Sequence, residues 1–414
     1  MSEPTRRARR AIVFAGGGAR GAYEAGVIQY ILDELPARLG HQPRFDILCG
    51  TSVGAIHACF LAATAHLTAN RGARLANVWN SMRVEEVLPL SMKDLLGLPR
   101  RLLGLRRTAA TLRSGQAPER LYGLLNTEAL ERLVMRSVPW RSIRRNVKEG
   151  VVDAVCVAAT QIATGRVTVF VDNRDRSISE WTRDPMLVPR ATRLLPAHAL
   201  ASAAIPMLFP AVRIARRYYV DGGLRLNTPL APAIRLGADR VLVVALRPDI
   251  RQFHERALER LRLEDYTSPA FLFGKVLNAL LLDHLDTDLA RMQLLNEVLS
   301  EGERAFGSEF LPRINEVAEQ ERGRGFRQVQ HVVLRPSADL GVMAGRVLEN
   351  MPVDKSRSPL LRLATRNIST GRSAEADLLS YLLFDGDFVS PLIELGLADA
   401  RAREDELVEF FSDE

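Results

Sequence analysis

Residues 44–67 have the sequence RFDILCGTSVGAIHACFLAATAHL, which predicts a β-strand, a tight turn and a helix. The first part, residues 45–49, is a short run that is apolar except for Asp46 and ends at Gly50, which is typical of a buried β-strand. The part after Ser52 is apolar at nearly every position and spans several helical turns, so it predicts a buried helix. The chain must therefore turn sharply from a strand into a helix at Ser52.

The same strand–helix unit comes first in the chain. Residues 11–16, AIVFAG, predict a buried strand, and residues 21–35, GAYEAGVIQYILDEL, predict a helix that stops before Pro36. Strands that alternate with helices at this interval indicate an α/β fold with a mostly parallel sheet. Further strands are predicted at 151–160, 166–173, 211–215, 218–223, 238–246 and 329–336, and helices at about 268–298 and after 375.

The composition fits a globular protein with a large core, because 47% of the 414 residues are hydrophobic and 25% are charged. The net charge of +7 favours anionic partners, and a phospholipid surface fits better than nucleic acid because only 6% of residues are aromatic. Cys49, Cys59 and Cys156 lie in apolar runs and predict buried free thiols in a reducing compartment. No run approaches the ~20 apolar residues of a membrane span, so we expect a cytoplasmic protein that binds membranes only peripherally.

The turn at Ser52 carries the first chemical motif, which fits the pattern G-x-S-x-G. A sharp strand-to-helix turn exposes the serine hydroxyl, and glycines are needed where larger side chains would collide. The start of the following helix adds partial positive charge where an oxyanion would form. A simple glycine- and serine-rich turn is the competing interpretation. The predicted nucleophile elbow consists of Gly50, Thr51, Ser52, Val53 and Gly54.

A glycine run follows the first predicted strand. Backbone N–H groups at such a helix start can bind an anion closely. The run also fits the dinucleotide pattern G-x-G-x-x-G, but the second strand ends at Cys49 and lacks the acidic residue that would hold a ribose. We therefore interpret the run as an oxyanion hole with a fixed positive group, formed by Gly16, Gly17, Gly18, Ala19, Arg20 and Gly21.

Two later motifs are weaker when each is taken alone. Asp221 follows a predicted strand and precedes Gly222 and Gly223, an arrangement that is commonly a plain turn. The run ASAAIPMLFP at residues 201–210 is typical of a helix end broken by Pro206.

Together, GGGARG, GTSVG, ASAAIPMLFP and DGG occur in an order that closely resembles the patatin-like phospholipases, over residues 11–232. The resemblance implies a three-layer α/β/α fold and a Ser–Asp dyad without a histidine. It makes Ser52 the nucleophile, Asp221 the base and later proton donor, and the amides around Gly17, Gly18 and Ala19 the oxyanion hole. It implies a lipid acyl-ester substrate and needs no metal or cofactor. Ala15 departs from the aspartate that many members have before the glycines.

From this resemblance we expect a catalytic domain at residues 11–236, with a cap or insertion at about 84–125. The C-terminal region, residues 237–414, is expected to extend the sheet with further strands and then to form helices. The chain's oligomeric state and exact lipid are not encoded in these motifs.

Three alternatives remain at this stage. A hydrolase triad would need a histidine, but those that follow Ser52 lie outside any glycine-rich turn: His198, His254, His284 and His331, with His57 expected to be packed or at the surface. A metal site at Asp283, Asp286 and Asp288 fits a solvated helix edge better. A lipid-binding scaffold with an inactive site is disfavoured because Ser52, Asp221 and the glycines are all present.

Residues 93–113 are the predicted membrane-contacting segment. Leucines alternate there with arginines, which suits a helix lying in a membrane interface. Gly97, Pro99 and Gly104 interrupt that helix, so packing of the leucines against the core is an equal alternative.

Overall fold

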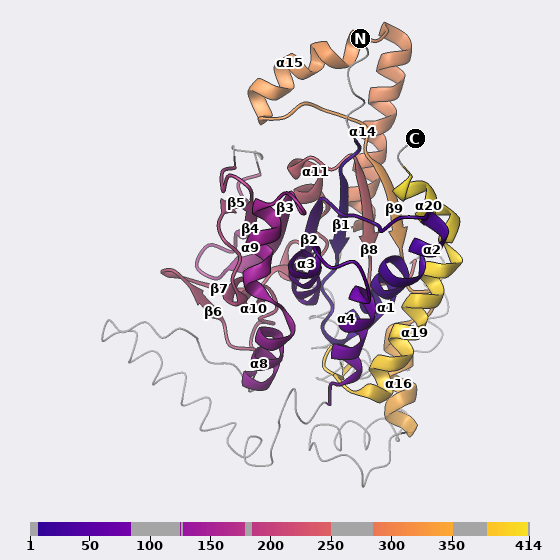
Figure 1. Cartoon of the computed structure of the whole chain (residues 1–414). Coiled ribbons are helices and arrows are strands. Elements are labelled where there is room, and N and C mark those ends of the chain that lie inside the picture. Colours follow the sequence, from indigo (N-terminus) through magenta and orange to yellow (C-terminus); the bar gives the residue numbers. More distant parts are fainter. Residues whose placement is uncertain are drawn as a thin grey trace, which may run out of the picture.

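The computed structural model describes residues 7–83, 125, 127–178, 184–249, 285–350 and 379–412. Within these ranges the chain is built around one nine-stranded sheet in the order β5-β4-β3-β2-β1-β8-β9, with β7 paired to both β3 and β6 (Figure 1). The strands are β1 Arg10–Phe14, β2 Ile47–Thr51, β3 Ala154–Gln161, β4 Val167–Asn173, β5 Leu187–Ala191, β6 Val212–Ile214, β7 Arg217–Asp221, β8 Arg240–Val244 and β9 Gln330–Leu334.

Most of the strand pairs are parallel, as the strand–helix alternation predicted. β1 runs parallel to β2 and β8, β3 is parallel to β2, and β9 is parallel to β8. β3 and β4 form an antiparallel hairpin, and β7 pairs antiparallel with both β3 and β6. β5 was not predicted, because this partly exposed strand contains Pro189 and lacks an alternating apolar pattern.

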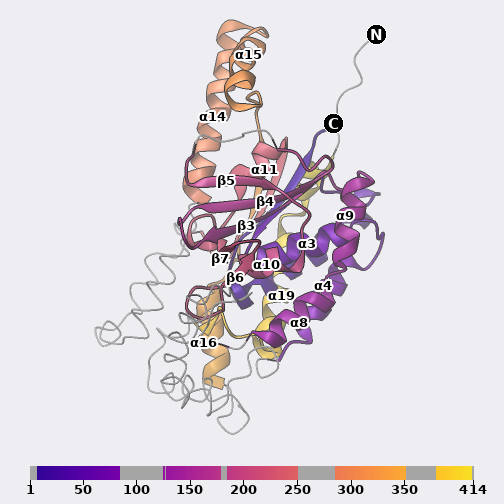
Figure 2. The ribbon, with the colours of Figure 1, turned by 90° about the vertical axis from the view of Figure 1, so that its left-hand side faces the viewer.

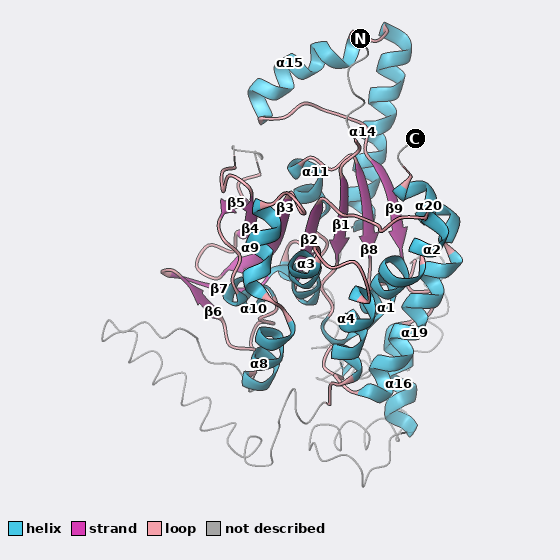
Figure 3. Cartoon of the chain, viewed as in Figure 1, coloured by secondary structure: helices cyan, strands magenta, loops and turns pink. Residues whose placement is uncertain are grey.

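Helices cover both faces of the sheet (Figures 2 and 3). Alternate side chains of β1 point to opposite faces, so that Ile12 and Phe14 join one core cluster while Ala11 and Val13 join the other. The result is the expected three-layer α/β/α arrangement. The helices are α1 Ala22–Gln29, α2 Pro36–Leu39, α3 Val53–Thr64, α4 Arg71–Asn80, α8 Glu128–Ser137, α9 Trp140–Lys148, α10 Pro196–Ser202, α11 Leu230–Leu236, α14 Leu285–Phe306, α15 Phe310–Arg322, α16 Leu340–Asn350, α19 Gly386–Ala402 and α20 Glu404–Phe411.

The first helical segment continues past its predicted end. A π-helical turn, Tyr30–Glu34, follows α1, and α2 then starts at Pro36 itself. Proline is accepted at the first position of a helix because its missing N–H would have no partner there. The prediction that the helical path stops before Pro36 is therefore wrong.

The described part of the C-terminal region, residues 237–414, packs into the same hydrophobic core as the N-terminal strands and helices. β8 and β9 extend the sheet beyond β1, and α19 packs along α1 and α4. Cys49, Cys59 and Cys156 are buried and free, as predicted. Among the described residues, no helix is long and apolar enough to cross a bilayer. The expected cap at 84–125 lies almost wholly outside the described residues, as does the predicted membrane segment at 93–113.

Candidate active site

Ser52 occupies the sharp turn between β2 and α3. Its backbone has φ 55° and ψ −124°, a conformation that costs a non-glycine residue about 1–3 kcal/mol. The flanking glycines are required by close packing: a Cβ on Gly50 would lie 2.1 Å from the Gly54 carbonyl oxygen, and one on Gly54 would lie 2.6 Å from Phe14 Cβ. Ser52 is therefore held in a strained conformation between two closely packed glycines.

Asp221 lies beside Ser52, at the end of β7. The antiparallel pairing of β7 with β3 places Asp221 opposite Ala159, and β3 in turn pairs with β2, which leads into Ser52. The Ser52 hydroxyl faces the Asp221 carboxylate and, as a hydrogen-bond donor, lowers its pKa. The Gly223 N–H donates a hydrogen bond to Asp221 Oδ1 at 2.7 Å. Both side chains are almost fully buried, with 5% of Ser52 and 1% of Asp221 exposed.

Burial raises the pKa of Asp221 to about 7, because the charged carboxylate has lost its water. The hydrogen bonds from Ser52 and Gly223 lower this pKa, but by less than burial raises it. A carboxylate with a pKa near neutrality is a far better proton acceptor for a serine than an aspartate in water.

We predict that kcat/KM for a small soluble ester rises with pH and reaches half its maximum near pH 7. Only the ionised form of Asp221 can take the proton from Ser52. A pH–rate profile between about pH 5 and 9 checks this, and a profile that stays flat through pH 7 would contradict it.

The same pKa predicts a stability effect for Asp221→Asn. An unfolded aspartate ionises near pH 4, whereas folded Asp221 keeps its proton up to about pH 7. The free energy of unfolding therefore falls as the pH rises from about 4 to 7, by up to ~4 kcal/mol at ~1.4 kcal/mol per pKa unit. The asparagine variant should have a higher Tm than the wild type at about pH 8 and little difference at about pH 4.

One motif holds both residues in place, in a way that its sequence did not reveal. Ser202, the last residue of α10, accepts a hydrogen bond from the Ser52 N–H at 2.8 Å and donates one to the Ala158 carbonyl at 2.6 Å. Two residues later, the Ala204 carbonyl accepts the Asp221 N–H at 2.8 Å. The run that was predicted to be only a helix end thus binds the backbones of Ser52 and Asp221.

The glycine run lies against Ser52. A Cβ on Gly16 would come within 3.0 Å of Ser52 Cβ, and the side-chain amide of Asn227 donates to the Gly16 carbonyl at 3.2 Å. The Ala19 N–H donates to the Tyr381 carbonyl at 3.0 Å. The N–H groups of Gly17 and Gly18 have no recorded acceptor within the described part of the chain. Of the three amides expected to form the oxyanion hole, these two remain available to a ligand.

The Arg20 side chain is buried against the C-terminal region. Its Nε donates to Ser380 Oγ at 2.7 Å, and its guanidinium lies 4.1 Å from the centre of the Tyr381 ring. The segment that contains Ser380 and Tyr381 therefore contacts the glycine run through both the Tyr381 carbonyl and Arg20. The sequence of this segment predicts no role in the site, because its contacts join residues far apart in the chain.

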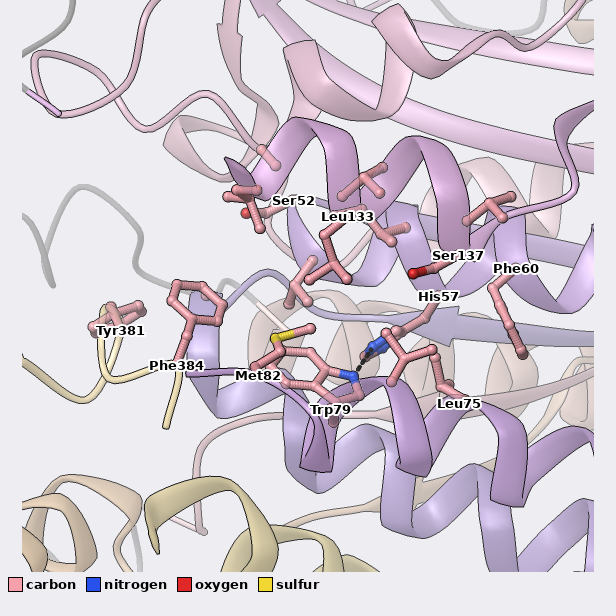
Figure 4. Close-up of a pocket in the computed structure, with 18 of the residues that line it drawn as sticks. Ser52, His57, Phe60, Leu75, Trp79, Met82, Leu133, Ser137, Tyr381 and Phe384 are labelled. Carbon is pink, nitrogen blue, oxygen red and sulfur yellow. Dashed lines mark hydrogen bonds between the residues drawn. The ribbon is translucent and has the colours of Figure 1, made fainter. Parts of the chain in front are cut away.

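An apolar pocket begins at Ser52 and follows α3 (Figure 4). Its walls come from α3, α4, α8, the turn after α10 and the segment around Tyr381 and Phe384. They include Ile56, Phe60, Leu75, Val78, Trp79, Leu130, Leu133, Val134, Ile205 and Phe209. Nearly all of these side chains are hydrocarbon, which suits the alkyl chain of a ligand.

His57 also lines the pocket, but both of its ring nitrogens are engaged. Trp79 Nε1 donates to His57 Nε2 at 3.0 Å, so the proton of the neutral ring is on Nδ1, which donates to Glu24 at 2.6 Å. Burial lowers the pKa of His57 to about 3 and keeps the ring neutral. His57 is packed, one of the two positions expected for it.

The remaining histidines do not approach Ser52 in the described ranges. His198 Nδ1 accepts the Leu195 N–H at 3.0 Å, and its ring packs 4.7 Å from Phe170. His331 lies on β9 at the other edge of the sheet. His254, His284 and Asp283 fall outside the described residues, while Asp286 and Asp288 pair with Arg335 and Arg291. No group of three potential metal ligands is found among the residues that the structure describes.

Comparisons with known proteins place this geometry in context. A family model described as patatin-like phospholipase matches residues 12–234. A cGAMP-activated phospholipase of Pseudomonas aeruginosa is 30% identical over 220 residues, which cover 53% of this chain and 53% of that protein. The chain thus aligns with about half the length of this relative.

Two solved structures also resemble the chain. VipD from Legionella pneumophila shows 14% identity and a TM-score of 0.31, with 91% of this chain and 67% of that chain covered. Human GIVD cytosolic phospholipase A2, in complex with methyl gamma-linolenyl fluorophosphonate, shows 15% identity and a TM-score of 0.40, with 99% and 60% covered. At these values neither likeness assigns an activity to this chain.

Proposed function

We propose a reaction for this chain, which belongs to the patatin-like phospholipase family: hydrolysis of a fatty-acyl ester through an acyl-enzyme on Ser52. Family membership supports lipid ester hydrolysis as the class of activity. The observation that carries the specific proposal is the position of Ser52 beside buried Asp221, whose pKa it lowers as a hydrogen-bond donor, at the start of an apolar pocket.

In the first half of the reaction, Asp221 takes the proton of Ser52 as Oγ attacks the ester carbonyl. The carbonyl oxygen becomes an oxyanion, which the N–H groups of Gly17 and Gly18 can bind. Removing one such donor typically costs 10²–10³-fold in kcat, so the two form a major part of the catalytic power. Asp221 then returns the proton to the leaving alcohol, and the acyl group stays on Ser52.

In the second half, water attacks the acyl-enzyme. Asp221 removes a proton from this water, the same oxyanion site binds the new tetrahedral intermediate, and the proton returns to Ser52 Oγ as the fatty acid leaves. These steps need no group beyond the side chains and amides of the chain itself and water.

The shape and lining of the pocket favour a substrate that is recognised by a long acyl chain. Ser52 and Phe60, at the two ends of its α3 wall, are eight residues apart, a helical rise of ~12 Å. This approaches the ~15 Å of hydrocarbon in one leaflet of a bilayer. An acyl chain that entered along this wall would contact apolar side chains, with each buried methylene contributing about 0.8 kcal/mol.

A larger side chain in the pocket wall should lower turnover of long-chain esters more than turnover of short-chain esters. We predict that Leu133→Trp lowers kcat/KM for long-chain phospholipids by about 100-fold, because excluding about four methylenes loses ~3 kcal/mol. Turnover of an acetyl or butyryl ester should change little, since Leu133 lies beyond the reacting atoms in the pocket wall. Mass spectrometry of the released fatty acids, beside a chromogenic short-chain ester assay, measures both.

The matched control is Met135→Trp on the same helix, because the Met135 side chain is 56% exposed and does not line the pocket. If Leu133→Trp lowered kcat/KM equally for long and short esters, the pocket would not be the binding site of the acyl chain. If the wild type released no fatty acid from any phospholipid or glyceride, the lipid hydrolase proposal itself would fail.

A further inference from the structure

A strongly basic surface lies beside the pocket, and we call it the arginine ridge. It consists of residues 161–166, 206–207, 213–218 and 225, and it includes the tip of the β6–β7 hairpin, which projects from the body of the protein (Figure 1). The Ile162 N–H donates to the Tyr218 carbonyl at 3.0 Å, so the turn between β3 and β4 lies directly against β7. Arg225 reaches the same turn, where a Cβ on Gly165 would lie 3.8 Å from its guanidinium.

The ridge is continuous with the active site. The turn after α10 contributes Ile205 and Phe209 to the pocket wall, while Met207 between them is 62% exposed. β7 runs from the exposed Arg217 directly to Asp221. A flat partner that covers the ridge would therefore lie next to the pocket and to Ser52.

The charge of the ridge is entirely positive. Its segments contain five arginines and no aspartate or glutamate: Arg166, Arg213, Arg216, Arg217 and Arg225. Arg166, Arg216, Arg217 and Arg225 are exposed, and no ion pair with a described residue is recorded for them. By contrast, Arg9, Arg144 and Arg335 each pair with an aspartate elsewhere on the protein.

Apolar side chains stand among these charges. Ile162 is 47% and Met207 is 62% exposed. Met207 also has φ 65°, in the left-handed region that is uncommon for residues other than glycine, asparagine and aspartate. Its side chain is exposed and is not part of either core cluster. Arginines that flank exposed apolar side chains are the combination that binds the interface of an anionic membrane.

We propose that the arginine ridge docks this protein on an anionic lipid bilayer, with its arginines on the lipid phosphates and Met207 and Ile162 in the headgroup layer. Docking in this way would hold the pocket and Ser52 at the membrane. The inference rests on the proposed function, because it takes the substrate to be a membrane lipid. It uses described residues that are separate from the predicted segment at 93–113.

The test is vesicle co-sedimentation of the full chain carrying Ser52→Ala, so that lipid is bound but not consumed. Arg166→Gln, Arg216→Gln and Arg217→Gln together should weaken binding to phosphatidylglycerol-containing vesicles about 100-fold, as expected for ~1 kcal/mol per arginine. Met207→Asn should weaken it further, and asparagine tolerates the left-handed backbone. In the wild-type background, the triple variant should keep its turnover of a soluble short-chain ester.

The matched control removes the same charge from the other end of the molecule, by Arg291→Gln, Arg304→Gln and Arg313→Gln on α14 and α15 (Figure 1). An equal loss of binding in this control would overturn the proposal, because net charge alone would then explain it. Unchanged binding of the ridge variant would also overturn it, and so would equal binding of the unsubstituted ridge to phosphatidylcholine vesicles. Loss of heparin or RNA binding without loss of vesicle binding would assign the ridge to a soluble polyanion instead.

These readouts separate the two proposals. If vesicle binding depends on the ridge but no fatty acid is ever released, the docking proposal holds and the hydrolase proposal fails. If the enzyme hydrolyses dispersed lipids equally well with and without the ridge arginines and neither form binds vesicles, the docking proposal alone fails.

Discussion

Replacing Ser52 with alanine, or Asp221 with asparagine, is expected to lower kcat by about 10⁴-fold or more. Ser52→Ala removes the atom that attacks the ester. Asp221→Asn keeps the shape of the side chain but removes the carboxylate that faces the Ser52 hydroxyl. Because the two groups act in one step, the double variant should be little slower than either single variant.

The measurement is steady-state turnover of a soluble ester, with a fluorophosphonate probe to report the reactive serine. Wild-type enzyme should be labelled at Ser52. Ser137→Ala is the matched control, because Ser137 also lines the pocket but lies on α8, apart from Ser52. Substantial turnover in either dyad variant, or labelling at another serine, would refute the assignment of the dyad.

The second largest effect is expected for Gly18→Ala, with kcat lowered by about 10²–10³-fold. Gly18 has φ 57°, and a Cβ there would lie 2.2 Å from the Tyr381 carbonyl oxygen, which also accepts the Ala19 N–H. Relieving this clash must shift either the glycine run or Tyr381. Such a shift misaligns the Gly17 and Gly18 amides relative to the oxyanion, and losing one donor typically has an effect of this size.

Gly40→Ala separates this effect from backbone strain. Gly40 has φ 75°, but a Cβ there meets nothing within 4 Å. Gly40→Ala should lower stability by the 1–2 kcal/mol of a left-handed backbone, as measured by thermal unfolding. Gly18→Ala should lose at least as much stability, because its Cβ also clashes with the Tyr381 carbonyl, and only Gly18→Ala should lower kcat strongly. If the two variants lose turnover equally, the glycine run does not position the oxyanion.

The local sequence pattern was sufficient to predict those elements whose structure depends mainly on residues within the same segment. The apolar run at 45–49, the small residues around Ser52 and the apolar helix that follows predicted the strand, the elbow and α3, because each depends mainly on neighbours along the chain. Where the pattern was weak, prediction failed. β5 has no alternation, and α2 begins at Pro36 directly after the π-helical turn.

What the sequence by itself determined is the strand–turn–helix at Ser52, the alternation that produces a mostly parallel sheet, and the identity of Ser52, Asp221 and the glycines as a candidate site. Only the tertiary structure decided that Ser202 binds the Ser52 N–H, that Tyr381 accepts the Ala19 N–H, and that His57 is buried and neutral with Glu24 and Trp79 on its ring nitrogens. These contacts join residues far apart in the chain. Their geometry depends on how whole elements pack, and a hydrogen bond between such residues has no fixed spacing that a sequence pattern could reveal.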